Sequence, residues 1–104
     1  LKNKNCFFYI GEIQQKKIGV VRIETKNNVG QVSINLNPKF RGMSLSANLL
    51  NESINKFKEK FNNYHLVAQI DKKNQASLRI FSKLGFKIKT CAKKYNIYEL
   101  CNDK

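Results

Sequence analysis

The chain has 104 residues, so it can form a single domain with a core of modest size. Its 20 basic and 7 acidic residues give a formal net charge of +13, and no apolar run approaches the roughly 20 residues of a membrane span. The sequence therefore predicts no transmembrane helix. Its three cysteines lack the spacing of metal ligands, and they favour reduced thiols in a cytoplasmic protein over a disulfide framework or a metal site.

The amino-terminal third of the sequence predicts three strands. Residues 6–13 and 18–24 are β-branched and aromatic runs, joined by the polar connection 14–17. Residues 25–30 form a second turn rich in asparagine, and residues 31–36 alternate between apolar and polar positions. Because the connections are short, the three strands are expected to form an antiparallel meander.

A helix follows the Asn-Pro corner at residues 37–42. Leu50, Ile54, Phe57 and Phe61 recur at spacings of four, three and four, which is the period of one helical face. The stripe predicts a helix that packs one apolar face on the meander and ends at two consecutive asparagines.

The rest of the sequence predicts a strand, a second helix and two further strands. Residues 66–70 are a short buried strand, and the second helix has an N-cap at Asn74 and a left-handed stop at Gly85. Residues 86–91 and 96–100 are the last two strands. The order β-β-β-α-β-α-β-β bounds the fold class to α/β or α+β.

The turn between the third strand and the first helix is a candidate anion site. A helix begins with backbone N–H groups that lack intrahelical partners, and its dipole favours negative charge at this end. Lys39 and Arg41 add positive charge beside these donors. The turn therefore predicts phosphate binding, although a serine at position 44 or 46 is also typical of a simple N-cap.

Two segments resemble signatures of the GNAT N-acetyltransferase superfamily. Arg41-Gly42-Met43-Ser44-Leu45-Ser46 is similar to the family's acetyl-coenzyme A loop, Gln/Arg-x-x-Gly-x-Gly/Ala. Residues 74–86 are similar in spacing to its signature Asn-x-x-Ala/Ser-x-x-x-Tyr/Phe-x-x-x-Gly-Phe. The resemblance implies a mixed, mostly antiparallel sheet, acetyl-CoA as cosubstrate and a primary amine as acceptor.

The resemblance also implies which residues hold acetyl-CoA, and the chain departs from the loop pattern at two of them. Both glycine positions of the loop are serines here, and a side chain restricts the backbone that glycine would free. Phe81 stands where many relatives carry a tyrosine that protonates the departing thiolate, which a phenyl ring does not do. The implied cofactor-binding residues are Leu36, Arg41, Gly42, Met43, Ser44, Leu45, Ser46, Asn74, Ser77 and Phe81.

Acetyl transfer needs a neutral amine, because a protonated amine has no lone pair. Glu24, at the end of the second strand, is the candidate general base, and Asn35 is a candidate for positioning a water molecule. A solvent-exposed strand end is the other interpretation of Glu24. The family pattern implies that a backbone N–H near Leu36 or Asn37 holds the oxyanion of the transition state.

Residues 1–104 are expected to form one GNAT-like domain that lacks the family's usual first strand and first helices. Such a domain is either fused to another segment or completed by a homodimer. The predicted reaction is direct acetyl transfer in a ternary complex, with an amino sugar of surface glycan synthesis as one candidate acceptor. The alternative is a non-catalytic CoA-binding module, or a basic RNA-binding one, built on a degenerate GNAT domain. Nucleic acid is the less expected partner, because the basic residues are mostly scattered lysines, and no membrane partner or metal is expected.

Overall fold

The fold follows the predicted order of elements. The computed structural model describes residues 4–40 and 45–100. Within these residues the elements are β1 (Lys4–Ile13), β2 (Lys16–Lys26), β3 (Val29–Leu36), a single 3₁₀ turn η1 (Pro38–Phe40), α1 (Leu45–Lys60), β4 (His65–Asp71), α2 (Gln75–Lys83), β5 (Phe86–Cys91) and β6 (Tyr95–Leu100). The mixed α/β class is therefore confirmed.

The strands form a six-stranded sheet in the order β1-β2-β3-β4-β6-β5. Neighbouring strands run antiparallel except β3 and β4, which are parallel, so the expected mixed, mostly antiparallel sheet and its meander are confirmed. The first hairpin is tighter than the predicted 14–17 connection. Gln14 and Gln15 alone form the loop, with φ of 52° and 68°, the left-handed values that a two-residue hairpin turn requires.

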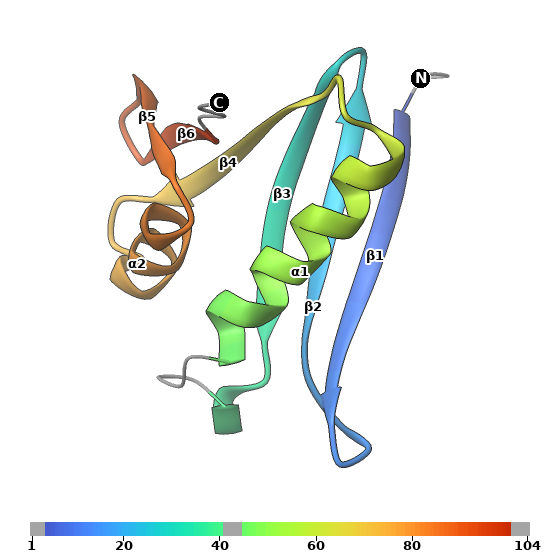
Figure 1. Cartoon of the computed structure of the whole chain (residues 1–104). Helices are drawn as coiled ribbons and strands as arrows, with labels where there is room; N and C mark the ends of the chain where they lie inside the picture. The colour runs from blue at the N-terminus through green and yellow to red at the C-terminus, as the bar shows by residue number, and fades with distance from the viewer. Residues whose placement is uncertain (1–3, 41–44, 101–104) are drawn as a thin grey trace.

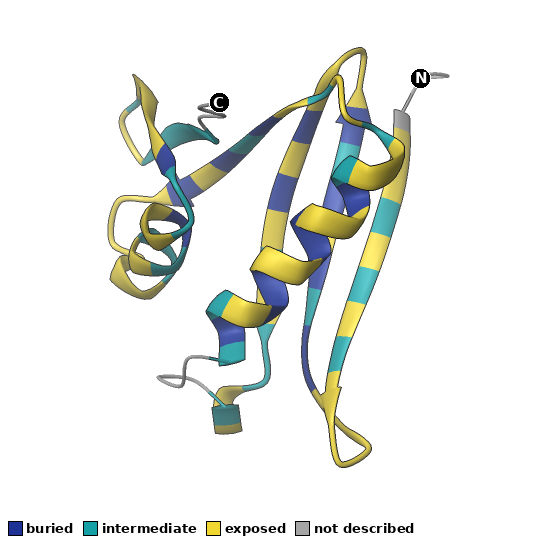
Figure 2. Cartoon of the chain, viewed as in Figure 1, coloured by how far each residue is buried: buried dark blue, intermediate teal, exposed yellow. Residues whose placement is uncertain are grey.

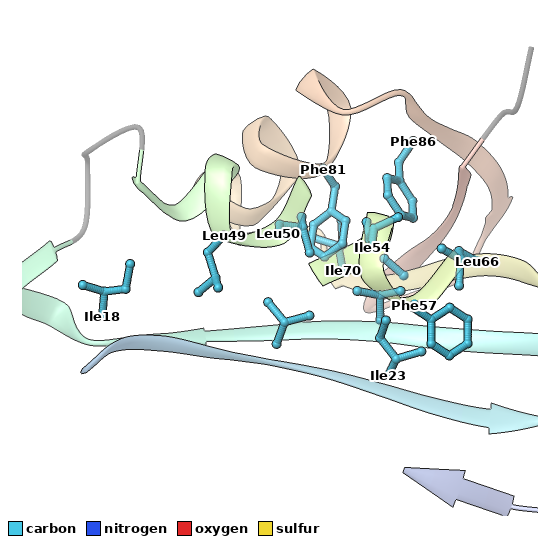
Figure 3. Packing of buried hydrophobic residues seen from close by; sticks show 13 residues of the cluster. Ile18, Ile23, Leu49, Leu50, Ile54, Phe57, Leu66, Ile70, Phe81 and Phe86 are labelled. Carbon is cyan, nitrogen blue, oxygen red and sulfur yellow. The ribbon is translucent and has the colours of Figure 1, made fainter. Parts of the chain in front are cut away.

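The helix α1 lies across the meander and buries the predicted stripe. Leu50 and Phe57 are fully buried, and Ile54 is nearly so. Figure 3 shows their side chains in the core, and Figure 2 shows buried positions along the side of α1 that faces the sheet. The Phe57 ring packs edge-on against Phe7, with centroids 5.7 Å apart, and lies 5.0 Å from the Phe61 ring. These aromatic contacts hold the end of α1 against β1.

The helix α2 packs on β4 and β5, and its Phe81 joins the same apolar core as Leu50 and Phe57. The Asn74 Oδ1 accepts the backbone N–H of Ser77 at 3.0 Å, which confirms the predicted N-cap. Gly85 has φ of +102°, and its N–H donates to the Ser82 carbonyl, so the helix ends where predicted. The Phe81 ring meets Phe86 edge-on at 5.0 Å (Figure 3).

Both helices lie on one face of the sheet, and the other face of the meander, called the outer face below, is uncovered (Figure 1). Phe8 and Ile10 on the outer face of β1 are 60% and 56% exposed, and Val29 lies on the same face of β3. Neither helix is long and apolar enough to span a bilayer, within residues 4–40 and 45–100.

Candidate active site between β3 and β4

The strands β3 and β4 pair over three residues only and then part. Their last pair is Gln31 with Val67, although β3 continues to Leu36 and β4 to Asp71 (Figure 1). Core side chains pack closely over Gly30 beside this last pair, since a Cβ there would lie 2.9 Å from the Leu66 Cδ2. The two strands therefore open like a V, with its narrow end at Gln31 and its wide end at Leu36.

Within residues 4–40 and 45–100, the edge of β3 that faces this opening carries peptide groups without a strand partner. The Asn37 N–H donates to the Ile18 carbonyl at 2.8 Å, so the odd-numbered residues of β3 are the ones whose peptide groups bond to β2. Because the pairing alternates along an antiparallel strand, the peptide groups of Ile34 and Leu36 point away from β2 and into the opening. Of the two residues implied for the oxyanion, Leu36 thus remains available, and the Asn37 N–H is already used within the sheet.

A pocket of about 250 Å³ lies at the wide end of the V, between β3, the start of α1 and the start of α2. It brings together residues that are far apart in the sequence. Its lining is Ile34, Asn35, Leu36, Ser46, Asn74, Ala76, Ser77 and Ile80. Five predicted site residues thus meet in one place: Asn35, Leu36, Ser46, Asn74 and Ser77.

A second hollow of about 130 Å³ continues between β3 and β4 and shares Ile34, Asn74 and Ser77 with the first. Phe81 lies here, 2% exposed, and its ring is held by Phe86. Position 81 is therefore beside the opening, as the family pattern implies, but it brings a hydrocarbon surface and no hydroxyl.

The start of α1 reaches the first pocket through Ser46, which is 4% exposed. The first turn of α1 contains no acidic residue, so its N–H groups and dipole are not neutralised from within the helix. Leu45, the first residue of α1, is half-buried and packs against the core. Arg41, Gly42, Met43 and Ser44 lie outside the described residues.

Asn74 serves both the fold and the pocket. Its Oδ1 is used as the cap of α2, and it lines both hollows. The N-cap interpretation is therefore confirmed. Because the cap uses only the side-chain oxygen, the Nδ2 group of Asn74 does not take part in it and can donate to a ligand.

The two predicted catalytic residues lie apart. Glu24 is opposite Gln31 on the outer face, where its Oε1 is 3.2 Å from the Arg22 Nη2, and it lines a different, shallow hollow near the β2–β3 turn. Asn35 is four residues beyond Gln31 on β3, a distance of about 13 Å along the strand at the usual rise per residue. Glu24 thus belongs to the narrow end of the V, and Asn35 to the wide end.

Sequence reasoning missed a second carboxylate at the narrow end. Cross-strand pairing sets Glu24, Gln31, Val67 and Glu99 in one row across four strands, so Glu24 and Glu99 lie on either side of the parting on the outer face. Glu99 contacts the His65 Nδ1 at 3.5 Å and the Lys89 Nζ at 3.2 Å. Only the register of β6 against β4 shows that Glu99 lies in this row. The periodicity of a sequence does not tell which residues of two strands are opposite each other.

This architecture is shared with known proteins. The family model described as acetyltransferase (GNAT) domain matches residues 1–87. No curated protein matches the sequence. Similar solved structures include the PaiA N-acetyltransferase of Thermoplasma acidophilum in complex with coenzyme A, with 18% identity, a TM-score of 0.82, and coverage of 92% of this chain and 60% of that one.

Two further structures have the same fold. The Campylobacter jejuni N-acetyltransferase PseH in complex with acetyl coenzyme A has 19% identity, a TM-score of 0.80, and coverage of 98% of this chain and 70% of that one. The ribosomal-protein-S5-alanine acetyltransferase of Vibrio fischeri has 20% identity, a TM-score of 0.74, and coverage of 83% and 54%. The chain thus spans 54% to 70% of the length of these three solved proteins. From the family match over most of its length, and the fold, we conclude that the chain belongs to the GNAT acetyltransferase family.

Proposed function

We propose that this domain transfers an acetyl group from acetyl-CoA to a primary amine. The observation that carries the proposal is the parting of β3 and β4 beside the start of α1, because it combines an open strand edge with a helix N-terminus. An extended amide chain that ends in a diphosphate, as in coenzyme A, matches both features. Two of the similar structures contain coenzyme A or acetyl coenzyme A, which supports the same ligand here.

The chain offers a donor for each part of this ligand. The N–H groups at the start of α1, with Arg41, would hold the diphosphate, and the loop residues Gly42, Met43 and Ser44 enter the proposal through the sequence resemblance. The peptide groups of β3 at Ile34 and Leu36 would pair with the amides of the pantetheine arm, as an added strand does. The Asn74 Nδ2 and the Ser77 hydroxyl are further donors that line the pocket.

Acetyl transfer in this site would run by direct attack of the amine on the thioester. The amine must first lose a proton, and the carboxylates of Glu24 and Glu99 flank the narrow end of the V, where an acceptor arriving from the outer face would meet the acetyl group. We keep Glu24 as the candidate base and add Glu99 as the second. Asn35 at the wide end would position a water molecule or the cofactor.

The departing thiolate would take its proton from water. Phe81 lines the opening but has no hydroxyl, so no acid stands at this position. This feature favours the alternative function, a domain that holds coenzyme A without turnover. Release of free thiol from acetyl-CoA in the presence of an amine distinguishes acetyl transfer from binding without turnover.

The acceptor class is the least constrained part of the proposal. An amino sugar of surface glycan synthesis stays our first candidate, with the similarity to PseH as its support, and a protein amine is the second, supported by the similarity to the ribosomal-protein-S5-alanine acetyltransferase. The exposed thiols of Cys6 and Cys91 fit a reducing compartment, so we propose a cytoplasmic location.

Filling the pocket tests the cofactor site. Ala76→Phe adds a ring to the lining of the 250 Å³ pocket, whereas Ser82→Phe adds the same ring to an exposed position of the same helix. For the native chain and Ser82→Phe we expect acetyl-CoA at 100 times its Kd to raise the free energy of unfolding by about 2.7 kcal/mol. Ala76→Phe should lose this gain. Equal stabilisation of both variants, or none of the native chain, would contradict the cofactor site.

Turnover tests the chemistry. Mixing the native chain with acetyl-CoA and an amine should release free thiol, and Glu24→Gln or Glu99→Gln should slow the release without weakening acetyl-CoA binding. Thermal stabilisation by acetyl-CoA without thiol release, over a panel that includes amino sugars and peptide amino termini, would support the non-catalytic module.

A further inference from the structure

The hollow of about 130 Å³ between β3 and β4 has walls from both faces of the sheet. Along each of these strands, side chains alternate between the helix side and the outer face. The lining of the hollow includes Ile34, Ile70 and Phe81 from the helix side, and Ser33, Gln69 and Asp71 from the outer face. Within residues 4–40 and 45–100, no strand pairing closes the gap between β3 and β4 past the pair of Gln31 with Val67. The hollow therefore passes through the sheet and joins the pocket at the wide end of the V to the outer face.

This passage gives an acceptor a route to the thioester. The route rests on the proposed function, in which acetyl-CoA occupies the helix side, so the acceptor meets it from the opposite end of the hollow. Because the hollow measures only about 130 Å³, it admits the reacting amine and the atoms next to it, and the rest of the acceptor stays outside. The side chains at the outer mouth, Ser33, Gln69 and Asp71, therefore meet the reacting end of the acceptor.

Asp71 is the charged residue among those that line the two hollows, within the described part of the chain. Its Oδ1 accepts the Lys73 N–H at 2.8 Å, and its backbone carbonyl accepts the Asn74 N–H at 2.9 Å. The turn that leads into α2 thus holds this side chain in place at the end of β4. Because the turn uses one carboxylate oxygen, Oδ2 can accept a hydrogen bond from a bound ammonium group.

The other two outer-face carboxylates near the parting are already paired with cations. Glu24 lies 3.2 Å from the Arg22 guanidinium, and Glu99 lies 3.2 Å from the Lys89 ammonium. Asp71 forms no ion pair with any residue in the ranges 4–40 and 45–100. In a chain of net charge +13, a cationic acceptor is repelled on average, so it binds best where a negative charge is not compensated.

We infer that Asp71 binds the ammonium group of the acceptor and makes the site selective for amines over neutral nucleophiles. Its role is in binding, and Glu24 and Glu99 stay the candidates for removing the proton before attack. The acceptor class that follows is a primary amine that is cationic in solution and reaches the hollow on an arm narrow enough to enter it.

Steady-state kinetics test this role. Asp71→Asn removes the charge but keeps an Oδ1 that can accept the Lys73 N–H, so the turn is preserved. With glucosamine and alaninamide as acceptors, Asp71→Asn should raise KM about tenfold or more, with a smaller change in kcat and none in the Kd of acetyl-CoA. Asp71→Glu should recover part of the loss. Glu59→Gln removes a charge from an exposed position of α1 and, as the matched control, should keep the native KM. Equal KM values in the native chain and Asp71→Asn, for whichever amine is turned over, would overturn the inference.

Binding without turnover separates this role from the proposed reaction. In calorimetric titrations, the CoA-saturated native chain should prefer glucosamine over glucose or alaninamide over lactamide, since each pair differs by an amine in place of a hydroxyl. Asp71→Asn should remove the preference, and high salt should weaken amine binding to the native chain alone. If amines bind through Asp71 but acetyl-CoA releases no thiol, the proposed reaction is wrong and the role of Asp71 stands. A preference that survives in Asp71→Asn, or none in the native chain, would show that Asp71 does not bind the acceptor.

Discussion

The two halves of the sheet differ in how they are stabilised. The meander β1–β3 has long strands of eight to eleven residues and a sixteen-residue helix that buries an aliphatic and aromatic stripe. The half built from β4–β6 and α2 has strands of six or seven residues, and every residue of β6 is only half-buried. Both halves contribute to one apolar core, which contains Phe57 from the first half and Phe81 and Phe86 from the second (Figure 3). Because β3 and β4 join the two halves of the sheet through only three residue pairs, a pocket opens between the halves where the strands part.

Removing the ring that packs α1 on the meander should have the largest effect. Phe57→Ala is expected to lower the free energy of unfolding by about 3–5 kcal/mol, because a fully buried ring in contact with three other rings leaves a cavity. Chemical denaturation gives the value. If the loss is below that of the more exposed Phe61→Ala, the meander is not centred on Phe57.

The junction between the halves should tolerate less bulk than its surroundings. Gly30→Val is expected to cost about 1–3 kcal/mol, because even its Cβ would lie 2.9 Å from the Leu66 Cδ2. Ser33→Val adds a side chain of similar size on the exposed face of the same strand and should change the free energy of unfolding little. If both variants lower the free energy of unfolding by similar amounts, Gly30 is not a site of tight packing.

The cap of α2 should separate stability from ligand binding. Asn74→Ala is expected to cost about 1 kcal/mol, because the Ser77 N–H loses its acceptor. Asn74→Asp keeps the acceptor and so the stability, but it removes the Nδ2 donors. If our cofactor site is correct, both variants should bind acetyl-CoA more weakly, which calorimetric titration measures. If Asn74→Asp binds acetyl-CoA with the affinity of the native chain, Asn74 acts only as the N-cap of α2.

The smallest effect is expected in alkaline solution. Burial raises the pKa of Tyr9 above its usual 10.0. The folded state then favours the protonated form, so this contribution to stability is intact below pH 10 and is lost as the pH rises through the folded-state pKa. Denaturation of the native chain and Tyr9→Phe between pH 8 and 11 checks the sign: only the native chain should lose this part, and an equal decline in both would contradict it.

Local rules predicted the elements because they depend on neighbours in the sequence. The stripe from Leu50 to Phe57, the cap at Asn74 and the stop at Gly85 each follow from spacing or backbone chemistry within a few residues. The family resemblance then identified four residues, Leu36, Ser46, Asn74 and Ser77, that the fold gathers into one pocket.

Register was the information that local rules lacked. Glu24 and Asn35 belong to neighbouring strands, and their separation depends on which residues are opposite each other. Glu99 is 75 residues from Glu24 in the sequence and becomes part of the same row only through three strand pairings. The loop at Gln14 and Gln15 was also harder to predict, because glutamine is seldom found at positive φ.

The three-pair junction between β3 and β4 has one consequence for how such a domain diverges. Since the angle between the strands depends on how each half packs, a substitution beneath α2 or α1 can widen or narrow the opening without changing any residue that lines it. Ligand preference would then drift through hidden positions, and selection could adjust it while every contacting side chain stays the same.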